Sequence, residues 1–388
     1  MQRRYEKLLS RHLWQSQQIA IVVGPRQVGK TASVRLAAGD HVYFSWERLE
    51  DRRRLLAAAG ALAADLGLGR PGQDSARVIF DGMQSHRRWQ RLVEEFLRGC
   101  AVPVHIAVTG TTEQVSPHQS LYRMHPLSVA ELIGTQIDVR GPARPLRPPA
   151  DGFAQLLRFG GFPEPFLRAS TRFSNRWRQQ HNQLFRQDLR ERMQIQQVDQ
   201  AEVLRELLAG LAGQPLNYSS LAQQIGTSVD TVRRWIDLLE RQFFCFTVRP
   251  WLNGVPKSLR QQPKLYLYDW SQISAAPERR QNLVASHLLK AVHWWTDVGL
   301  GTFQLCYLRD KTKRAVDFVV IRDGQPWFLV QVGSSGRQIS AALRYFHGLL
   351  ATSHAFQVSF DLGYLEQDCF TLRDAALVPA TTLLSQLA

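Results

Sequence analysis

The chain has 388 residues, of which 44% are hydrophobic and 21% are charged, and its formal net charge is +15. This composition excludes a largely disordered chain, and the length predicts roughly two to four domains. No apolar run reaches the roughly 20 residues that cross a bilayer, and the charged N-terminus leads into no apolar signal core. We therefore expect a cytoplasmic protein that does not contact a membrane.

Strand and helix patterns alternate through the first part of the chain. A buried-type strand is predicted at 18–23, and further strands are predicted at 42–45, 77–81 and 104–109. Helices are predicted at 1–17, from 32, at 46–69 and at 89–98. This alternation predicts an α/β domain with a mainly parallel sheet, and we assign residues 1–140 to it.

The pattern changes at residues 141–150, which hold four prolines in ten positions. Proline suits neither a helix interior nor a central strand, so this stretch predicts a linker or a surface excursion. Residues 152–212 are predicted to be mostly helical, and residues 141–205 are assigned to a helical lid or linker. Farther on, a helix is predicted at 282–295 and strands near 302–308, 316–321 and 327–332.

A phosphate-binding pattern, GxxxxGK[ST], is complete between the first predicted strand and the next helix. Its glycines let backbone N–H groups face phosphate oxygens, and the helix dipole points at the same anion. Lys30 would reach the β- and γ-phosphates, and Thr31 would ligate Mg²⁺. The predicted nucleotide-binding residues are Gly24, Pro25, Arg26, Gln27, Val28, Gly29, Lys30 and Thr31.

The second half of such a site is an acid at the end of a neighbouring strand, and Asp81 supplies it. Asp81 is predicted to hold Mg²⁺ through water. An efficient hydrolase usually places a glutamate next to orient the attacking water, but this chain has Gly82. Gln84 is a candidate for orienting that water, with a polar surface role as the alternative. We expect slow hydrolysis.

Two further residues are candidates for contact with the γ-phosphate. Thr109 ends the strand at 104–109 and offers a hydroxyl, with a capping or turn role as the alternative. Arg123 is a candidate arginine finger, acting in cis or from a neighbouring subunit, with an ordinary ion pair as the alternative. Action from a neighbouring subunit would require an oligomer.

These features resemble the bacterial and archaeal AAA-type P-loop ATPases that carry a C-terminal nuclease-like domain. The resemblance covers nearly the whole chain and implies ATP as the nucleotide. It also implies a winged helix-turn-helix over residues 206–270 and a PD-(D/E)xK nuclease-like α/β domain over residues 271–388. Besides the loop at 24–31, the matching segments are Thr109-Gly110, His-Pro-Leu-Ser-Val-Ala-Glu-Leu at 125–132, Gly-Gly-Phe-Pro-Glu-Pro at 160–165, Leu-Tyr-Leu-Tyr-Asp at 265–269 and Val-Asp-Phe-Val at 316–319.

The departures from that family are as informative as the matches. The family usually reads Asp-Glu-(Ile/Val)-Gln where residues 81–84 read Asp-Gly-Met-Gln. In the nuclease-like domain Asp317 stands at the aspartate position, whereas Gln281 stands where a glutamate is expected, and the Glu-x-Lys position at 331–333 reads Gln-Val-Gly. Because Mg²⁺ prefers hard anionic oxygens, we predict no nuclease activity.

Residues 219–235 have helix-turn-helix spacing, with Gly226 at the turn and Thr227 or Ser228 as the cap of the second helix. The basic net charge favours a nucleic acid such as DNA as partner, although arginine excess can also reflect genomic base composition. A winged helix used for packing or protein contact is the alternative. The candidate DNA contacts are Arg233 and Arg234 on the second helix and Lys257, Arg260 and Lys264 on the wing.

The leading hypothesis from the sequence is an ATP-gated switch that binds DNA or a protein partner. Nucleotide at Lys30 and Thr31 would set the orientation of the ATPase core against the rest of the chain. One alternative is an active ATPase motor or loader with a substitute catalytic base. The other is a protein-interaction scaffold in which ATP is structural.

Overall fold

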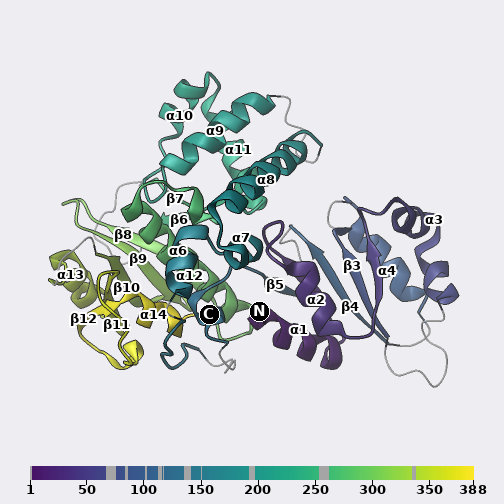
Figure 1. Cartoon of the computed structure of the whole chain (residues 1–388), viewed down its shortest axis with the longest axis horizontal. Coiled ribbons are helices and arrows are strands. Elements are labelled where there is room, and N and C mark those ends of the chain that lie inside the picture. Colours follow the sequence, from purple (N-terminus) through teal and green to yellow (C-terminus); the bar gives the residue numbers. More distant parts are fainter. Residues whose placement is uncertain are drawn as a thin grey trace. The chain divides into compact units, whose positions relative to one another are not determined.

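The computed structural model divides the chain into two compact units, Gln2–Met124 and His125–Ala388 (Figure 1). The finer division into four parts stays a prediction. Among the residues described, no helix is both long enough and apolar enough to span a membrane. The described residues are 2–66, 76–83, 86–100, 103–111, 116, 118–134, 141–149, 151–191, 197–252, 262–333 and 338–388.

The first unit is built on a five-stranded parallel sheet with the order β2-β3-β4-β1-β5. This confirms the predicted α/β class. The sequence pattern did not predict β5, because only Tyr122 of this edge strand is fully buried. The strands are β1 (Ile19–Val23), β2 (Val42–Ser45), β3 (Ala76–Asp81), β4 (Val104–Gly110) and β5 (Gln119–Arg123).

Helices alternate with these strands, and buried side chains such as Ile21, Phe80 and Val108 form the core beneath them. One predicted boundary was displaced. The helix after the glycine-rich turn begins at Lys30, because Gly29 (φ 104°) bends the chain directly into it. The helices are α1 (Arg4–Gln15), α2 (Lys30–Ala38), α3 (Leu49–Asp65) and α4 (Trp89–Arg98).

The second unit begins with helices, as the sequence predicts for residues 152–212. Asn217 caps α10 by accepting a hydrogen bond from the Ser220 amide (3.1 Å), and Ser228 caps α11 by accepting one from Thr231 (3.1 Å). Gly226 (φ 72°) makes the turn between these two helices. The helices are α5 (Val129–Leu132), α6 (Gly152–Phe159), α7 (Pro163–Arg168), α8 (Thr171–Glu191), α9 (Val198–Gly210), α10 (Tyr218–Ile225) and α11 (Val229–Arg241).

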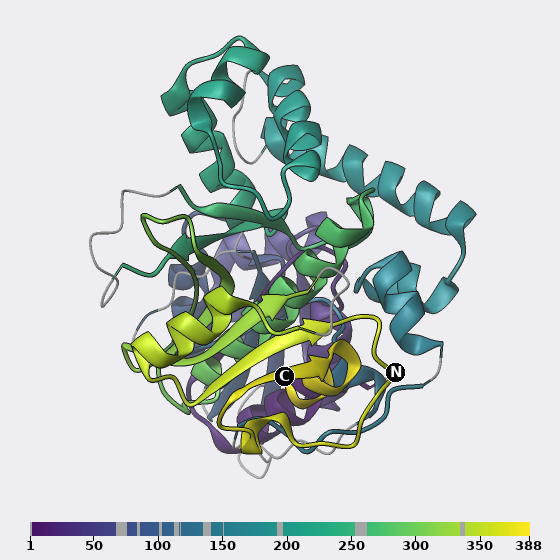
Figure 2. The same cartoon turned by 90° about the vertical axis from the view of Figure 1, so that its left-hand side faces the viewer.

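A seven-stranded mixed sheet follows, with the order β12-β11-β10-β9-β8-β6-β7. β6 (Cys245–Pro250) pairs antiparallel with β7 (Lys264–Leu267) and parallel with β8, so the strands of the predicted wing extend the C-terminal sheet. Figure 2 shows the green and yellow strands of this sheet side by side. The remaining elements are η2 (Trp270–Gln272), α12 (Ala276–Asp297), β8 (Phe303–Arg309), β9 (Ala315–Arg322), β10 (Gln325–Val332), α13 (Ala341–Leu350), β11 (His354–Ser359), η3 (Cys369–Thr371), β12 (Ala375–Pro379) and α14 (Ala380–Gln386).

Candidate nucleotide site

The glycine-rich loop lies between β1 and α2, at the carboxyl edge of the parallel sheet. Its backbone takes left-handed or strained conformations at Gly24 (φ 151°), Gln27 (φ 61°) and Gly29 (φ 104°). A Cβ atom at Gly24 would lie 2.2 Å from the carbonyl oxygen of Met124, so only glycine fits there. The loop therefore has the curled backbone that a phosphate-binding turn requires.

Lys30 opens α2 and turns back over the loop. Its ammonium group donates hydrogen bonds to the carbonyl oxygens of Gly24 (2.8 Å) and Pro25 (2.6 Å). Burial lowers the pKa of Lys30 to about 7, an effect that nearby Asp81 opposes and Arg26 reinforces. Phosphate oxygens at this position would favour the charged form of the lysine, which is the role predicted for it.

Three hydroxyl groups converge on the Asp81 carboxylate. Thr31 Oγ1 donates to Asp81 Oδ1 (2.7 Å), Thr109 donates to the same oxygen, and Tyr43 donates to Oδ2 (2.8 Å). The predicted magnesium residues Thr31 and Asp81 are thus in contact, and their oxygens are the hard ligands that Mg²⁺ prefers. With the metal bound, Thr31 would ligate it directly and Asp81 would hold one of its waters.

Tyr43 is a member of this cluster that the sequence analysis missed. Its pKa rises to about 12, through burial first and the hydrogen bond to Asp81 second. The guanidinium groups of Arg35 and Arg48 lie over its ring, at 5.0 and 5.6 Å from the centroid. One sequence feature could have indicated that Tyr43 lies near Asp81: it is on β2, the strand that pairs with the strand ending in Asp81.

Gly82 follows Asp81 with a left-handed backbone (φ 69°), and its amide donates to Thr109 Oγ1 (3.2 Å). Thr109 therefore contacts both residues of this turn, and its contact with the γ-phosphate stays a prediction. The expected water-orienting residue Gln84 lies outside the described residues. Gly82 leaves no side chain at the position where an efficient hydrolase carries a glutamate.

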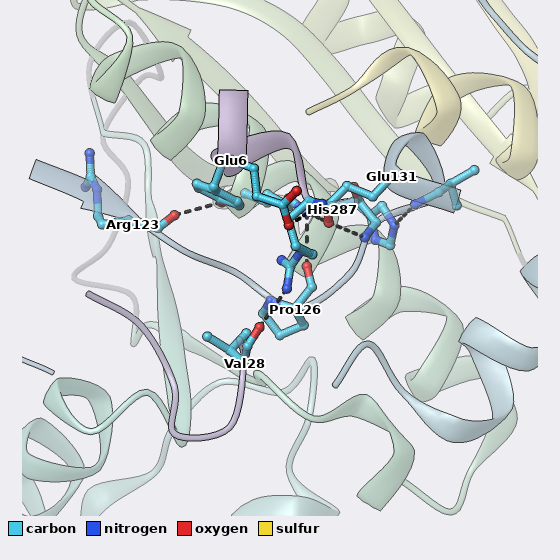
Figure 3. A network of polar contacts seen from close by, with 11 residues as sticks. Glu6, Val28, Arg123, Pro126, Glu131 and His287 are labelled. Atoms are coloured by element: carbon cyan, nitrogen blue, oxygen red, sulfur yellow. Dashed lines mark hydrogen bonds and ion pairs between the residues drawn. The ribbon is translucent and has the colours of Figure 1, made fainter. Parts of the chain in front are cut away.

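Arg123 ends β5 in register with Val23, the residue that precedes Gly24. Because parallel strands end at one edge of a sheet, Arg123 lies at the same edge as the loop. Its carbonyl oxygen accepts a hydrogen bond from Tyr5 (2.8 Å), and Figure 3 shows its guanidinium pointing away from that bond. This placement is compatible with phosphate contact in cis or in trans.

Arg3 is a second residue that the sequence analysis missed. Its side chain is 6% exposed, and Nη1 donates to the carbonyl oxygen of Val28 (2.6 Å), in the middle of the loop (Figure 3). The same residue is the N-cap of α1, and its amide donates to Glu6 Oε1 (3.1 Å). No local motif distinguishes this arginine, because its partner is a backbone carbonyl 25 positions away.

In the second unit, four N–H donors surround Asp317 on β9. They come from Gln281 (2.7 Å), Gln331 (2.6 Å), the Val332 amide (3.0 Å) and Lys264 (3.4 Å). Lys264, expected on the wing, thus lies beside the carboxylate. Within the described ranges, no group of three or more His, Cys, Asp or Glu residues is placed to hold a metal ion.

The two arginines of α11 lie on its exposed face, whereas Val232, Trp235 and Ile236 are buried on the other. Arg233 lies over the ring of Tyr218, with 5.2 Å from its guanidinium to the centroid. Arg234 is likewise exposed. Lys257 and Arg260, the other candidate DNA contacts, lie outside the described residues.

Two family models match parts of the chain. Residues 16–133 match the AAA domain family, and residues 150–282 match a domain of unknown function (DUF8612). No curated protein matches the chain significantly.

Among solved structures, the Walker-type ATPase PABY2304 of Pyrococcus abyssi is 12% identical, with a TM-score of 0.39 over 72% of this chain and 95% of that one. A signal transduction ATPase with numerous domains and a tetratricopeptide repeat sensor, from Pyrococcus horikoshii, is 12% identical, with a TM-score of 0.30 over 76% of this chain and 47% of that one. The family match and the parallel sheet agree that the chain contains an AAA-type P-loop domain for ATP binding.

Proposed function

We propose that this protein is an ATP-gated switch that hydrolyses ATP slowly. The proposal rests on the turn after β3. Asp81 there accepts hydrogen bonds from the hydroxyl groups of Thr31 and Thr109, whereas the next residue, Gly82, has no side chain that could act as a base. A bound nucleotide would be held by the loop and its metal, while the attacking water would lack a carboxylate to orient it. A long-lived ATP state suits a switch better than a motor.

We propose that the segment after β5 transmits the effect of bound nucleotide to the second unit. Arg123 ends β5, and the segment of residues 125–131 begins two positions later along the chain. Lys290 of α12, which is 1% exposed, pairs with buried Glu131 and donates to the carbonyl oxygen of Pro126 (3.1 Å) (Figure 3). Such a buried, fully paired cluster makes the segment and α12 move as one body.

His287 adds a neutral contact to the same junction. Its Nδ1–H donates to the Leu283 carbonyl (2.8 Å), which leaves Nε2 to accept from the Val129 amide (3.0 Å). Burial lowers the pKa of His287 to about 4, so the ring keeps this arrangement at neutral pH. A displacement at β5 would therefore reach α12 through both charged and neutral contacts.

Close backbone packing holds the segment from another side. A Cβ atom on Gly161 would lie 2.8 Å from Pro126 Cβ and 2.6 Å from the Trp270 ring. The Leu127 amide also donates to the Gly161 carbonyl (2.6 Å). The Gly-Gly-Phe-Pro motif thus packs against the 125–131 segment.

For the output surface we propose a winged helix formed by α10, α11 and the β6–β7 pair, with DNA as its ligand. Exposed Arg233 and Arg234 and the basic net charge support this proposal. We also propose that residues 271–388 are a nuclease-like domain without activity, because nitrogen donors occupy the Asp317 carboxylate.

The switch can be tested by hydrogen exchange at the amides of residues 125–131 and of α12, with and without ATP and Mg²⁺. We expect ATP to change exchange at both places in the wild type and at neither in Lys30→Ala. A protein in which ATP protects only the loop and α2 is not a switch of this kind. It would instead match the scaffold hypothesis, in which ATP is structural.

The DNA ligand has its own test. Binding to duplex DNA is measured at several salt concentrations for the wild type and for Arg233→Gln/Arg234→Gln, beside Arg172→Gln/Arg176→Gln on the exposed side of α8. We expect weaker binding and a shallower salt dependence in the first pair only. Equal losses in both pairs would indicate non-specific attraction and favour a protein partner.

A further inference from the structure

A polar cavity of about 420 Å³ lies in the helical part of the second unit. Four residues of α8, spaced by one helical turn, form one of its walls, and α9 forms another. All of its lining lies within residues 150–282, away from the nucleotide loop in the sequence. The residues that matter here are Asn175, Arg178, Gln179, Asn182, Arg205 and Glu206.

Arg205 is the unusual member of this lining, because its side chain is only 9% exposed. It donates a hydrogen bond to Asn182 Oδ1, and its guanidinium lies 5.8 Å from the ring centroids of both Phe185 and Phe244. These neutral partners hold the guanidinium in place without neutralising it. Arginine stays charged in proteins, so this is a buried cation.

Three carboxylates of α9 lie near Arg205 in sequence. Glu206, the next residue along the helix, attracts the guanidinium electrostatically but makes no ion pair with it among the described residues. Asp199 and Glu202 pair with Arg186, at 2.7 and 3.4 Å. In the part of the chain that the structure describes, Arg205 forms no ion pair, and its Nε is buried without a hydrogen-bond partner. A buried cation without a direct ion pair is costly, so the site favours an anion in contact with the guanidinium.

Arg178 provides a second guanidinium in the same cavity. Its Nη2 donates to Asn175 Oδ1 (3.2 Å), and its Nε, like that of Arg205, is buried without a partner among the described residues. Side-chain amides of Asn182 and Gln179 stand beside the two cations. Two guanidinium forks and several amides offer more donors than the two oxygens of a carboxylate can use.

We propose that this cavity binds a phosphate group, carried by a small phosphorylated molecule or free in solution. A phosphate presents enough oxygens to accept from both arginines at once. Exposed Glu206 at the rim limits the negative charge that the cavity tolerates, so a single phosphate fits better than a polyphosphate. This inference does not depend on the proposed ATP switch.

Binding is best measured by calorimetry in a Lys30→Ala background, which removes the phosphate ligand of the nucleotide loop. The probes are inorganic phosphate, a nucleoside monophosphate and acetate at matched ionic strength. We expect both phosphates to bind and acetate not to bind. Tighter binding of the monophosphate would assign a phosphorylated small molecule, and tighter binding of inorganic phosphate would assign the free ion.

The variant Arg178→Gln removes one of the two guanidinium groups. Because Arg178 is only half-buried, we expect the variant to fold like the wild type. We expect its Kd for phosphate to rise roughly tenfold or more, while the control Arg176→Gln, on the exposed side of α8, leaves it unchanged. An unchanged Kd in Arg178→Gln, equal binding of acetate, or no phosphate binding in the Lys30→Ala protein would each overturn the proposal.

Discussion

Thr31 Oγ1 donates a hydrogen bond to Asp81 Oδ1 over 2.7 Å, which joins the first turn of α2 to the end of β3. Thr109, at the end of β4, donates to the same oxygen. The residues that the sequence predicts for magnesium are thus in contact, although they come from segments 50 positions apart. The hydrogen bonds keep the carboxylate oriented toward the loop.

Gly82 allows the slow-hydrolysis proposal to be tested directly. Its Cβ position is open, with Trp46 Cβ the nearest atom at 3.9 Å, but the left-handed backbone disfavours any side chain by about 1 kcal/mol. Gly82→Glu and Gly82→Gln carry the same backbone strain, and only the first adds a carboxylate. We expect steady-state ATP turnover to rise by on the order of tenfold or more in Gly82→Glu alone. Equal rates in the two variants would show that the missing base does not limit turnover.

The Lys30 ammonium should make ATP binding depend on pH. Burial holds its pKa at about 7 in the free protein, and phosphate charges favour the protonated form. Above pH 7 binding must therefore take up a proton, so affinity should fall as pH rises, by up to about tenfold per pH unit.

Calorimetry between pH 7 and 9, where the terminal phosphate of ATP is already ionised, measures this effect. The residual binding of Lys30→Ala provides the control and should show no such dependence. A wild-type affinity that stays constant over the same range would mean that Lys30 is fully charged in the free protein.

Arg3 should hold the nucleotide loop in its binding conformation through the Val28 carbonyl. We expect Arg3→Gln to weaken ATP binding about three- to tenfold, because a charge-assisted hydrogen bond to the loop is lost. Arg11→Gln on the exposed side of α1 removes the same charge and is the control. Equal ATP affinities for the two variants would assign Arg3 to the packing of α1 alone.

Most of the first unit could be predicted from sequence because its signals are local. Four of the five strands, the helices between them and the phosphate loop follow hydrophobic periodicity or a contiguous motif. The edge strand β5 was missed, because it carries polar residues such as Gln119 and Ser120. Tyr43 and Arg3 were missed because their partners lie far away in sequence, and no spacing rule connects them.

In the second unit, too, contacts between residues far apart in the sequence could not be predicted. The sequence motif places no lysine beside Asp317, because position 333 is a glycine. In the structure Lys264 lies beside Asp317 instead, and it comes from a different strand, β7. The buried pair of Glu131 and Lys290 likewise joins a helix of four residues to α12, 159 positions later. Pattern reasoning finds elements, whereas side chains that meet across elements are set by tertiary packing.

Breaking the buried ion pair of Glu131 and Lys290 should lower the stability of the fold. Glu131→Gln or Lys290→Met alone would leave an uncompensated buried group, and we expect each to lower the free energy of unfolding by about 3–5 kcal/mol. The double variant should lose less than the sum of the two, since no charge then remains buried. Urea denaturation of the four proteins completes the cycle. Additive losses would mean that the two side chains do not act as a pair.

The central claim is that ATP is bound firmly and hydrolysed slowly. ATP binding and hydrolysis should be measured on one preparation of the wild type and of Lys30→Ala, with and without duplex DNA. The account predicts tight binding with little turnover in the wild type, and loss of that binding in Lys30→Ala. Brisk turnover that depends on Lys30 would contradict it, and would require a catalytic base other than the residue at position 82.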